Sequence, residues 1–260
     1  MTVQRRQVGR VVFHPDRRWT VLTLDCHVNN VVRLVEAWDW QNAFPGADAD
    51  KLGLSHNYVV TAAQIHDMAK PSHFRLKYEG TKRSSAKWEY SFSGHRFGVE
   101  HDHLYVKQLG LLHHEYSVDG ITKAIAQLRN EPAISTYADN FALDLYTLEM
   151  ADQIEATVAR AAVGSESPEE RVFMDFVFEP LASSECQYRI EPFPFVDTPV
   201  RLQIEYAAMQ PPYEQVIAIE QAKSQEQRKP LLRSLQDWLL ETLQTAPLET
   251  REITLWPWTR

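Results

Sequence analysis

The chain is poor in cysteine and glycine. Its 260 residues include two cysteines, Cys26 and Cys186, and nine glycines. Two distant cysteines without a CxxC pair exclude a disulfide framework and a thiolate zinc site, so any metal must be held by histidine and carboxylate. The low glycine content excludes a fibrous or low-complexity architecture, and 44% hydrophobic with 24% charged residues is an ordinary globular composition.

Long apolar segments and a leader sequence are also missing. No uninterrupted apolar stretch approaches the roughly 20 residues needed to cross a bilayer. The first six residues, Met-Thr-Val-Gln-Arg-Arg, lack the apolar region of a signal peptide. We therefore expect a cytoplasmic protein without membrane contact.

Charge and histidine are distributed unevenly along the chain. The net charge is −8, but residues 1–163 carry 18 basic against 19 acidic residues, whereas residues 164–260 carry 9 against 16. The acidity therefore belongs to the second part. All ten histidines lie between His14 and His114, so we expect the chemistry of the protein in the first part.

Hydrophobic periodicity predicts that residues 1–165 are mainly helical. Apolar residues recur at spacings of three and four in the segments 28–35, 59–67, 101–112, 118–128 and 138–162. The polar, basic segment 74–98 is interrupted by glycine and predicts a loop. The run from Gly164 to Pro168 predicts the end of the helical part.

The second part has a different pattern. Segments 172–178 and 201–206 are rich in β-forming residues and predict strands. Pro230 is expected to open a helix, because proline is favoured in a first turn, with an apolar stripe that includes Leu235, Leu239 and Leu243. We expect this helix to pack on its own sheet. The sequence thus predicts a mainly α fold, with a helical domain at 1–165 and a small α+β appendage at 166–260 that could dock a partner.

The dipeptide His66-Asp67 ends one predicted helix, and Lys70 follows on the same face as Asp67. A carboxylate beside an imidazole can bind a metal, and a lysine one turn away can hold a phosphate against it. Short motifs of this kind often occur by chance, but here other candidates surround the dipeptide. They are His27, His101, the pair His113-His114, and Asp152.

In the order H, HD, H, HH, D, the chain resembles the HD superfamily of metal-dependent phosphohydrolases. More narrowly, it resembles the HD nuclease domain of the CRISPR-associated nuclease-helicase of type I interference systems. The resemblance runs from about residue 20 to residue 160, and it rests on the segments 24–28 (LDCHV), 62–70 (AAQIHDMAK), 100–102 (EHD) and 111–114 (LLHH). It implies an HD-domain helical bundle for this part of the chain.

The resemblance also implies a ligand set for two metal ions, with Lys70 neutralising the scissile phosphate and Asp67 shared between the ions. The first ion would be held by His27, His66, Asp67 and Asp152, and the second by Asp67, His101, His113 and His114. His95 is close enough in the sequence to compete with His101 for its position. The family often has glycine at the positions of Ala69 and Glu115, where a larger side chain could narrow the cleft.

Two divalent ions about 4 Å apart can hold a phosphodiester, generate hydroxide at neutral pH and stabilise the leaving oxygen. Because histidine supplies most of the expected ligands, we predict two transition-metal ions, with manganese, iron, cobalt or nickel favoured over magnesium.

The segment after the motif helix mixes cations with aromatic side chains. Phosphate pairing and base stacking of this kind bind single-stranded nucleic acid, although basic segments are also common as solvated loops. The predicted nucleic-acid-binding residues are Arg75, Lys77, Lys82, Arg83, Lys87 and Trp88.

Together with these patterns, the resemblance implies a metal-dependent nuclease that cleaves single-stranded DNA in type I CRISPR interference. The chain has no GxxxxGK[ST] or other helicase signature, so the expected partners are a separate helicase subunit and the CRISPR RNA-guided surveillance complex. Two alternatives stay open at this point. One is an HD phosphohydrolase of a small nucleotide or cyclic nucleotide, and the other is a catalytically silent HD interaction module.

Overall fold

The structure is a computed structural model that describes residues 5–40, 44, 46, 49–79, 87–164, 176–181, 186–196 and 199–257. Helices make up 53% of it and strands 23%, so the fold is α+β. The mainly α fold class expected from the sequence is therefore wrong. The predicted helices of the first part are present, but that part also contributes strands that its sequence pattern did not reveal.

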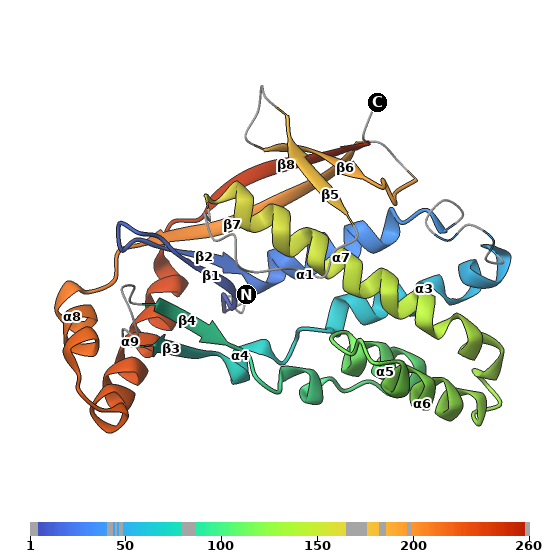
Figure 1. The fold of residues 1–260 in the computed structure, drawn as a ribbon, viewed down its shortest axis with the longest axis horizontal. Coiled ribbons are helices and arrows are strands. Elements are labelled where there is room, and N and C mark those ends of the chain that lie inside the picture. Colours follow the sequence, from blue (N-terminus) through green and yellow to red (C-terminus); the bar gives the residue numbers. More distant parts are fainter. Residues whose placement is uncertain are drawn as a thin grey trace.

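A six-stranded curled sheet is formed by strands from both ends of the described chain (Figure 1). Its order is β1-β2-β7-β8-β6-β5, and all neighbours are antiparallel except β6 and β8. The strands are β1 (Val8–Phe13), β2 (Trp19–Thr23), β5 (Val177–Pro180), β6 (Gln187–Glu191), β7 (Val200–Met209) and β8 (Glu249–Pro257). Strands on both sides of residue 165 thus share one sheet.

The β1 and β2 strands were not predicted because both of their faces are buried. Every residue of β2 is buried, between β1 and β7. Leu22 packs into the core on one face of the sheet, and its neighbour Val21 packs into the core on the other face. A strand buried on both faces lacks the alternation of apolar and polar residues that marks a half-exposed strand. In β7 the alternation is present, and the strand predicted at 201–206 is confirmed.

A group of helices packs against one face of the sheet (Figure 1). The helices predicted in the first part are confirmed as α1 (Leu24–Glu36), α3 (Ala49–Ile65), α5 (Leu104–Leu112), α6 (Val118–Arg129) and α7 (Phe141–Ala162), with the 3₁₀ turn η2 (Ser135–Asn140) before α7. Asn30 fixes α1 to the sheet, because its side chain both donates to and accepts from the backbone of Gln203 in β7. These helices supply most of the candidate ligands.

The segment 74–98, predicted as a loop, contains an antiparallel hairpin. Its strands are β3 (Arg75–Glu79) and β4 (Lys87–Ser91), and the short helix α4 (Lys70–His73) precedes them. In β3 Leu76 and Tyr78 are buried while Arg75, Lys77 and Glu79 are exposed, so the strand follows the usual two-residue period. The loop prediction is wrong because it followed the basic, glycine-interrupted composition of the whole segment, whereas the alternation at 75–79 spans only five residues.

The C-terminal part adds α8 (Tyr213–Gln221) and α9 (Gln225–Thr245). The predicted stripe is confirmed: Leu235, Leu239 and Leu243 are fully buried in a core shared with β2, β7 and the hairpin. The helix starts five residues before Pro230, because the side chain of Ser224 caps it by accepting a hydrogen bond from the backbone of Gln227. Of the strand predicted at 172–178, only the end lies within the described residues, where β5 begins at Val177.

Among the described helices, none combines the length and the apolar character that a membrane span requires.

Candidate metal centre

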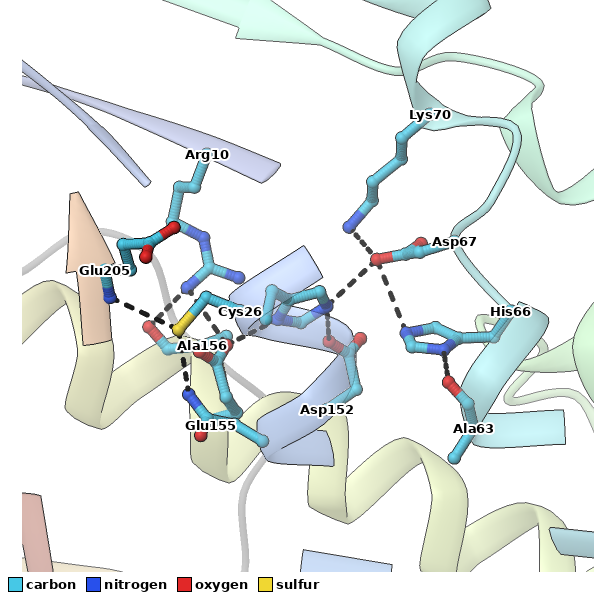
Figure 2. A network of polar contacts seen from close by, with 12 residues as sticks. Arg10, Cys26, Ala63, His66, Asp67, Lys70, Asp152, Glu155, Ala156 and Glu205 are labelled. Atoms are coloured by element: carbon cyan, nitrogen blue, oxygen red, sulfur yellow. Dashed lines mark hydrogen bonds and ion pairs between the residues drawn. The ribbon is translucent and has the colours of Figure 1, made fainter. Parts of the chain in front are cut away.

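Asp67 lies at the centre of a buried polar site between α1, α3 and α7. The α3 helix ends at Ile65, and the next four residues form a turn before α4. This turn directs the side chains of His66 and Asp67 inward, and both are fully buried. The α1 helix brings His27 to the site. The α7 helix brings Asp152 (Figure 2). The four side chains form the first of two groups.

We call His27, His66, Asp67 and Asp152 the inner group. Each offers one ligand atom, and these atoms all lie within 4.8 Å of one another. The Nε2 atom of His27 lies 2.9 Å from Oδ2 of Asp67 and 3.3 Å from Oδ1 of Asp152. The Nε2 atom of His66 lies 3.4 Å from the same Oδ2 of Asp67. All four residues are buried, so a cation among them would be removed from bulk water.

We call His95, His113 and His114 the outer group, and its ligand atoms also lie within 4.8 Å of one another. It faces the other oxygen of Asp67: Oδ1 lies 3.1 Å from Nε2 of His95 and 3.7 Å from Nε2 of His113. Asp67 therefore presents one carboxylate oxygen to each group. The structure thus contains two buried or partly buried His/Asp clusters that could hold metal ions.

Backbone carbonyls orient three of the imidazole rings. The Nδ1 atoms of His66, His95 and His113 lie 2.8, 2.8 and 2.5 Å from the carbonyl oxygens of the residues three positions earlier, at Ala63, Phe92 and Gly110. A carbonyl oxygen can only accept, so each Nδ1 must carry the proton. In the neutral ring, Nε2 then holds the lone pair. All three lone pairs point toward Asp67, as in ligands prepared for a cation.

Two buried atoms at this point are unsatisfied by hydrogen bonds. Among the residues that the structure describes, Nε2 of His66 and Oδ1 of Asp67 have no hydrogen-bond partner. An imidazole lone pair facing a carboxylate oxygen is unfavourable unless a proton or a metal cation lies between them. The donor set of imidazole nitrogen and carboxylate oxygen matches divalent transition metals, so the residues present fit such ions.

The charges of Asp67 and His113 agree with metal binding. Burial alone would raise the pKa of Asp67, but Lys70 and His66 hold that pKa well below its ordinary value. Burial and the adjacent imidazole of His114 lower the pKa of His113 well below its ordinary value. At neutral pH Asp67 is therefore ionised and His113 is neutral, and these are the forms that coordinate a metal.

Lys70 connects this centre to a large cleft. Its ammonium group forms an ion pair with Oδ2 of Asp67 (Figure 2) and lies 5.3 Å from the ring centroid of Phe92. The cleft has a volume of about 1270 Å³, and Lys70, His95 and His114 line one part of it. The rest of its wall comes from β1, β4 and neighbouring segments, with Arg96 and Arg160 among the lining residues. The centre therefore opens to solvent on the side of the outer group.

The structure brings together six of the seven metal ligands predicted from the sequence, and it places His95 rather than His101 beside Asp67. His101 lies in neither group among the described residues, and its Nδ1 accepts a hydrogen bond from the backbone of His103. His95 begins the 3₁₀ turn η1 (His95–Gly98). A Cβ at Gly98 would lie 2.7 Å from the Cβ of Ala69, so this glycine lets η1 approach the turn after Asp67.

The remaining histidines have other partners. His14 contacts Thr20, His56 accepts from the indole of Trp40, His73 contacts the carbonyl of Ser93, and His103 stacks on Tyr58. Glu115 accepts a hydrogen bond from the backbone of Ser117, and it is not among the residues that line the described cleft.

The predicted nucleic-acid-binding residues divide into three sets. Trp88 lines the cleft, while packing against Trp19 and Phe13. Arg75 and Lys77 are exposed on β3, and the lining of the described cleft does not include them. Lys82, Arg83 and the side chain of Lys87 lie outside the described residues.

Sequence reasoning missed two charged residues at this site. Oε2 of Glu155 lies 2.5 Å from Nδ1 of His27. Arg10 of β1 lies beside Glu155 (Figure 2). Glu155 follows Asp152 by three positions on α7, so both carboxylates share one helix face. That spacing was the available signal for Glu155, whereas Arg10 had none because β1 itself was not predicted.

Comparison of the chain with protein-family models, curated proteins and solved structures found no match.

Proposed function

We propose that the protein is a metal-dependent nuclease that cleaves phosphodiester bonds in single-stranded DNA. The observation that carries this proposal is the position of Asp67, whose two oxygens face two separate histidine groups. Two transition-metal ions fit this arrangement, held by the inner and outer groups with Asp67 between them. When bound, such ions supply Lewis-acid stabilisation of phosphoryl oxygens and lower the pKa of water.

The protein side chains have distinct roles in this proposal. Lys70 lies at the boundary between the centre and the cleft, where its ammonium group can pair with a phosphate oxygen of the substrate. The inner group is buried and keeps bulk water away from Asp67. The outer group lines the cleft through His95 and His114, so the scissile phosphate approaches from that side.

The cleft supports a polymeric substrate over a small nucleotide. Its volume of about 1270 Å³ exceeds the roughly 300–1,000 Å³ of typical small-molecule pockets. Arg96 and Arg160 can pair with phosphates, and Trp88, Tyr90 and Phe92 give the wall an aromatic character suited to exposed bases. In this proposal a separate helicase, acting with an RNA-guided complex, supplies the single strand.

The test is reconstitution of the metal-free protein with manganese or cobalt, followed by elemental analysis and two assays. We expect two metal equivalents per chain, degradation of single-stranded DNA, and hydrolysis of bis(p-nitrophenyl) phosphate. Duplex DNA should be a poor substrate. Failure to bind metal would overturn the proposal, and hydrolysis of small phosphodiesters without cleavage of single-stranded DNA would instead favour a small-nucleotide hydrolase.

A further inference from the structure

Glu155 and Arg10 form a charged pair that the proposed chemistry does not use directly. Both are held in the interior: the side chains of Glu155 and Arg10 are 2% and 11% exposed. Burying charges of this kind is costly unless each is paired and hydrogen-bonded. The position of the pair at the back of a metal-site histidine therefore suggests a specific role.

The geometry places Glu155 behind His27. Oε2 of Glu155 lies 2.5 Å from Nδ1 of His27, and the opposite ring nitrogen, Nε2, faces Asp67 and Asp152. The imidazole ring thus separates Glu155 from the inner group, and Glu155 belongs to neither group of candidate ligands among the described residues. Any effect of Glu155 on a bound cation must act through His27.

His27 differs from the other oriented histidines in its partner. His66, His95 and His113 each donate from Nδ1 to a neutral backbone carbonyl three residues earlier, whereas His27 donates to an ionised carboxylate. Arg10 lies 4.0 Å from the same carboxylate oxygen of Glu155 and compensates its charge. A charged acceptor makes a stronger hydrogen bond and a more basic imidazole.

Arg10 supports the carboxylate from β1. Its Nη1 atom lies 4.0 Å from Oε2 of Glu155 and donates to the carbonyl of Ala156, 2.7 Å away. This second contact fixes the strand to α7, so the sheet and the helix hold Glu155 in one position.

We propose that Glu155 is a positioning residue that fixes the proton of His27 on Nδ1, and so presents the Nε2 lone pair to a divalent cation in the inner group. The inference rests on the proposed metal-dependent function. It predicts that Glu155 tunes metal affinity at one group without touching the metal or the substrate.

The experiment compares Glu155→Ala and Glu155→Gln with the wild-type full chain, using calorimetric titration of metal-free protein with Mn²⁺ and the visible absorption spectrum with Co²⁺. Loss of such a supporting partner costs about 10- to 100-fold in metal affinity. We expect that weakening in Glu155→Ala for one of two bound ions, with an altered Co²⁺ spectrum. Glu155→Gln keeps an acceptor for the Nδ1 proton and should show an intermediate affinity.

Asp144→Asn is the matched control, because Asp144 is another fully buried carboxylate on α7. It should bind both ions with wild-type affinity. Wild-type affinity and an unchanged Co²⁺ spectrum in folded Glu155→Gln and Glu155→Ala would overturn the inference alone. If Glu155→Ala does not fold, Glu155→Gln decides, because it preserves the volume of the side chain. Absence of metal binding by the wild-type chain would instead overturn the proposed function.

Discussion

The inner and outer groups share Asp67 but differ in charge and access. The inner group adds Asp152 to two histidines and is wholly buried, whereas the outer group consists of three histidines and opens on the cleft. A cation in the inner group would therefore have two carboxylates as neighbours, Asp67 and Asp152. A cation in the outer group would be near a single carboxylate oxygen, Oδ1 of Asp67. The inner group is thus suited to retaining an ion, and the outer group is suited to contact with a substrate.

The largest effect is expected when Asp67 is replaced. Asp67→Asn keeps the volume of the side chain but removes the charge that both groups share, so we expect loss of both ions and of all cleavage above the metal-free level. Elemental analysis and a single-stranded DNA assay measure the two effects. Circular dichroism shows whether the fold is retained. Full activity in a folded Asp67→Asn variant would exclude the proposed centre.

A smaller and more selective effect is expected when each group loses one histidine. His114→Ala should lower the metal content from two ions to one, with the remaining ion at wild-type affinity, because His114 contributes only to the outer group. His66→Ala should instead lose the tighter ion, because His66 contributes only to the inner group. Calorimetric titration of both variants separates these outcomes, and identical losses in the two would erase the distinction between the groups.

These ligands show how much of the site the sequence could predict. The dipeptide His66-Asp67 and the pair His113-His114 could be predicted because their members are adjacent in the sequence and end predicted helices. The competition between His95 and His101 could not be decided, because both lie in the segment before α5 and the sequence does not show which of them folds back toward Asp67. Contacts between η1 and the turn after Asp67 decide it, and they depend on the hairpin that the sequence pattern predicted as a loop.

The fold was predictable where one face of an element is buried and the other exposed. The α1 helix and the β7 strand meet that condition along most of their length. The β1 and β2 strands do not, because the sheet lies between two cores and both faces of these strands are covered. Since Arg10 comes from β1, the missed strand also concealed a charged partner of the metal centre.

A moderate effect on substrate binding is expected when basic residues of the cleft are replaced, and a smaller one when exposed basic residues of β3 are replaced. Replacing Arg96 and Arg160 by alanine should weaken binding of single-stranded DNA, because each arginine can pair with a phosphate. The slope of log K against log salt should fall by about 0.7 for each phosphate that is no longer paired. Replacing Arg75 and Lys77, which are exposed on β3, should change the slope less. Fluorescence anisotropy at several salt concentrations measures both.

Hydrolysis of bis(p-nitrophenyl) phosphate provides the control for the cleft variants, because this small substrate needs the metal centre rather than the length of the cleft. The rate of this hydrolysis should stay at the wild-type level in the Arg96/Arg160 variant and in the Arg75/Lys77 variant. A flatter slope for the Arg75 and Lys77 variant alone would place the nucleic acid on the hairpin, as the sequence pattern predicted, and would contradict the role of the cleft.

The smallest effect on activity is expected when Asp144 is replaced. This buried carboxylate of α7 lies outside the two groups, so it can be compared with Asp152, which lies within one of them. Tyr105 donates a hydrogen bond to Asp144 over 2.5 Å, and burial raises the pKa of Asp144 from 3.8 to about 7. The folded state therefore binds this proton more tightly than the unfolded state. The contribution of the group to stability is full below pH 3.8 and is lost as the pH rises toward 7, at roughly 1.4 kcal/mol per pH unit.

Asp144→Asn removes this titration while keeping an acceptor for Tyr105. The variant should therefore gain stability relative to the wild type between about pH 5 and pH 8, by up to a few kcal/mol, at about 1.4 kcal/mol per pKa unit. Urea unfolding at the two pH values measures the gain, and metal content should stay the same because Asp144 belongs to neither group among the described residues. An identical difference in stability between variant and wild type at both pH values would show that Asp144 is already ionised in the folded protein. A change in metal content would show that the metal centre extends further along α7 than its two groups.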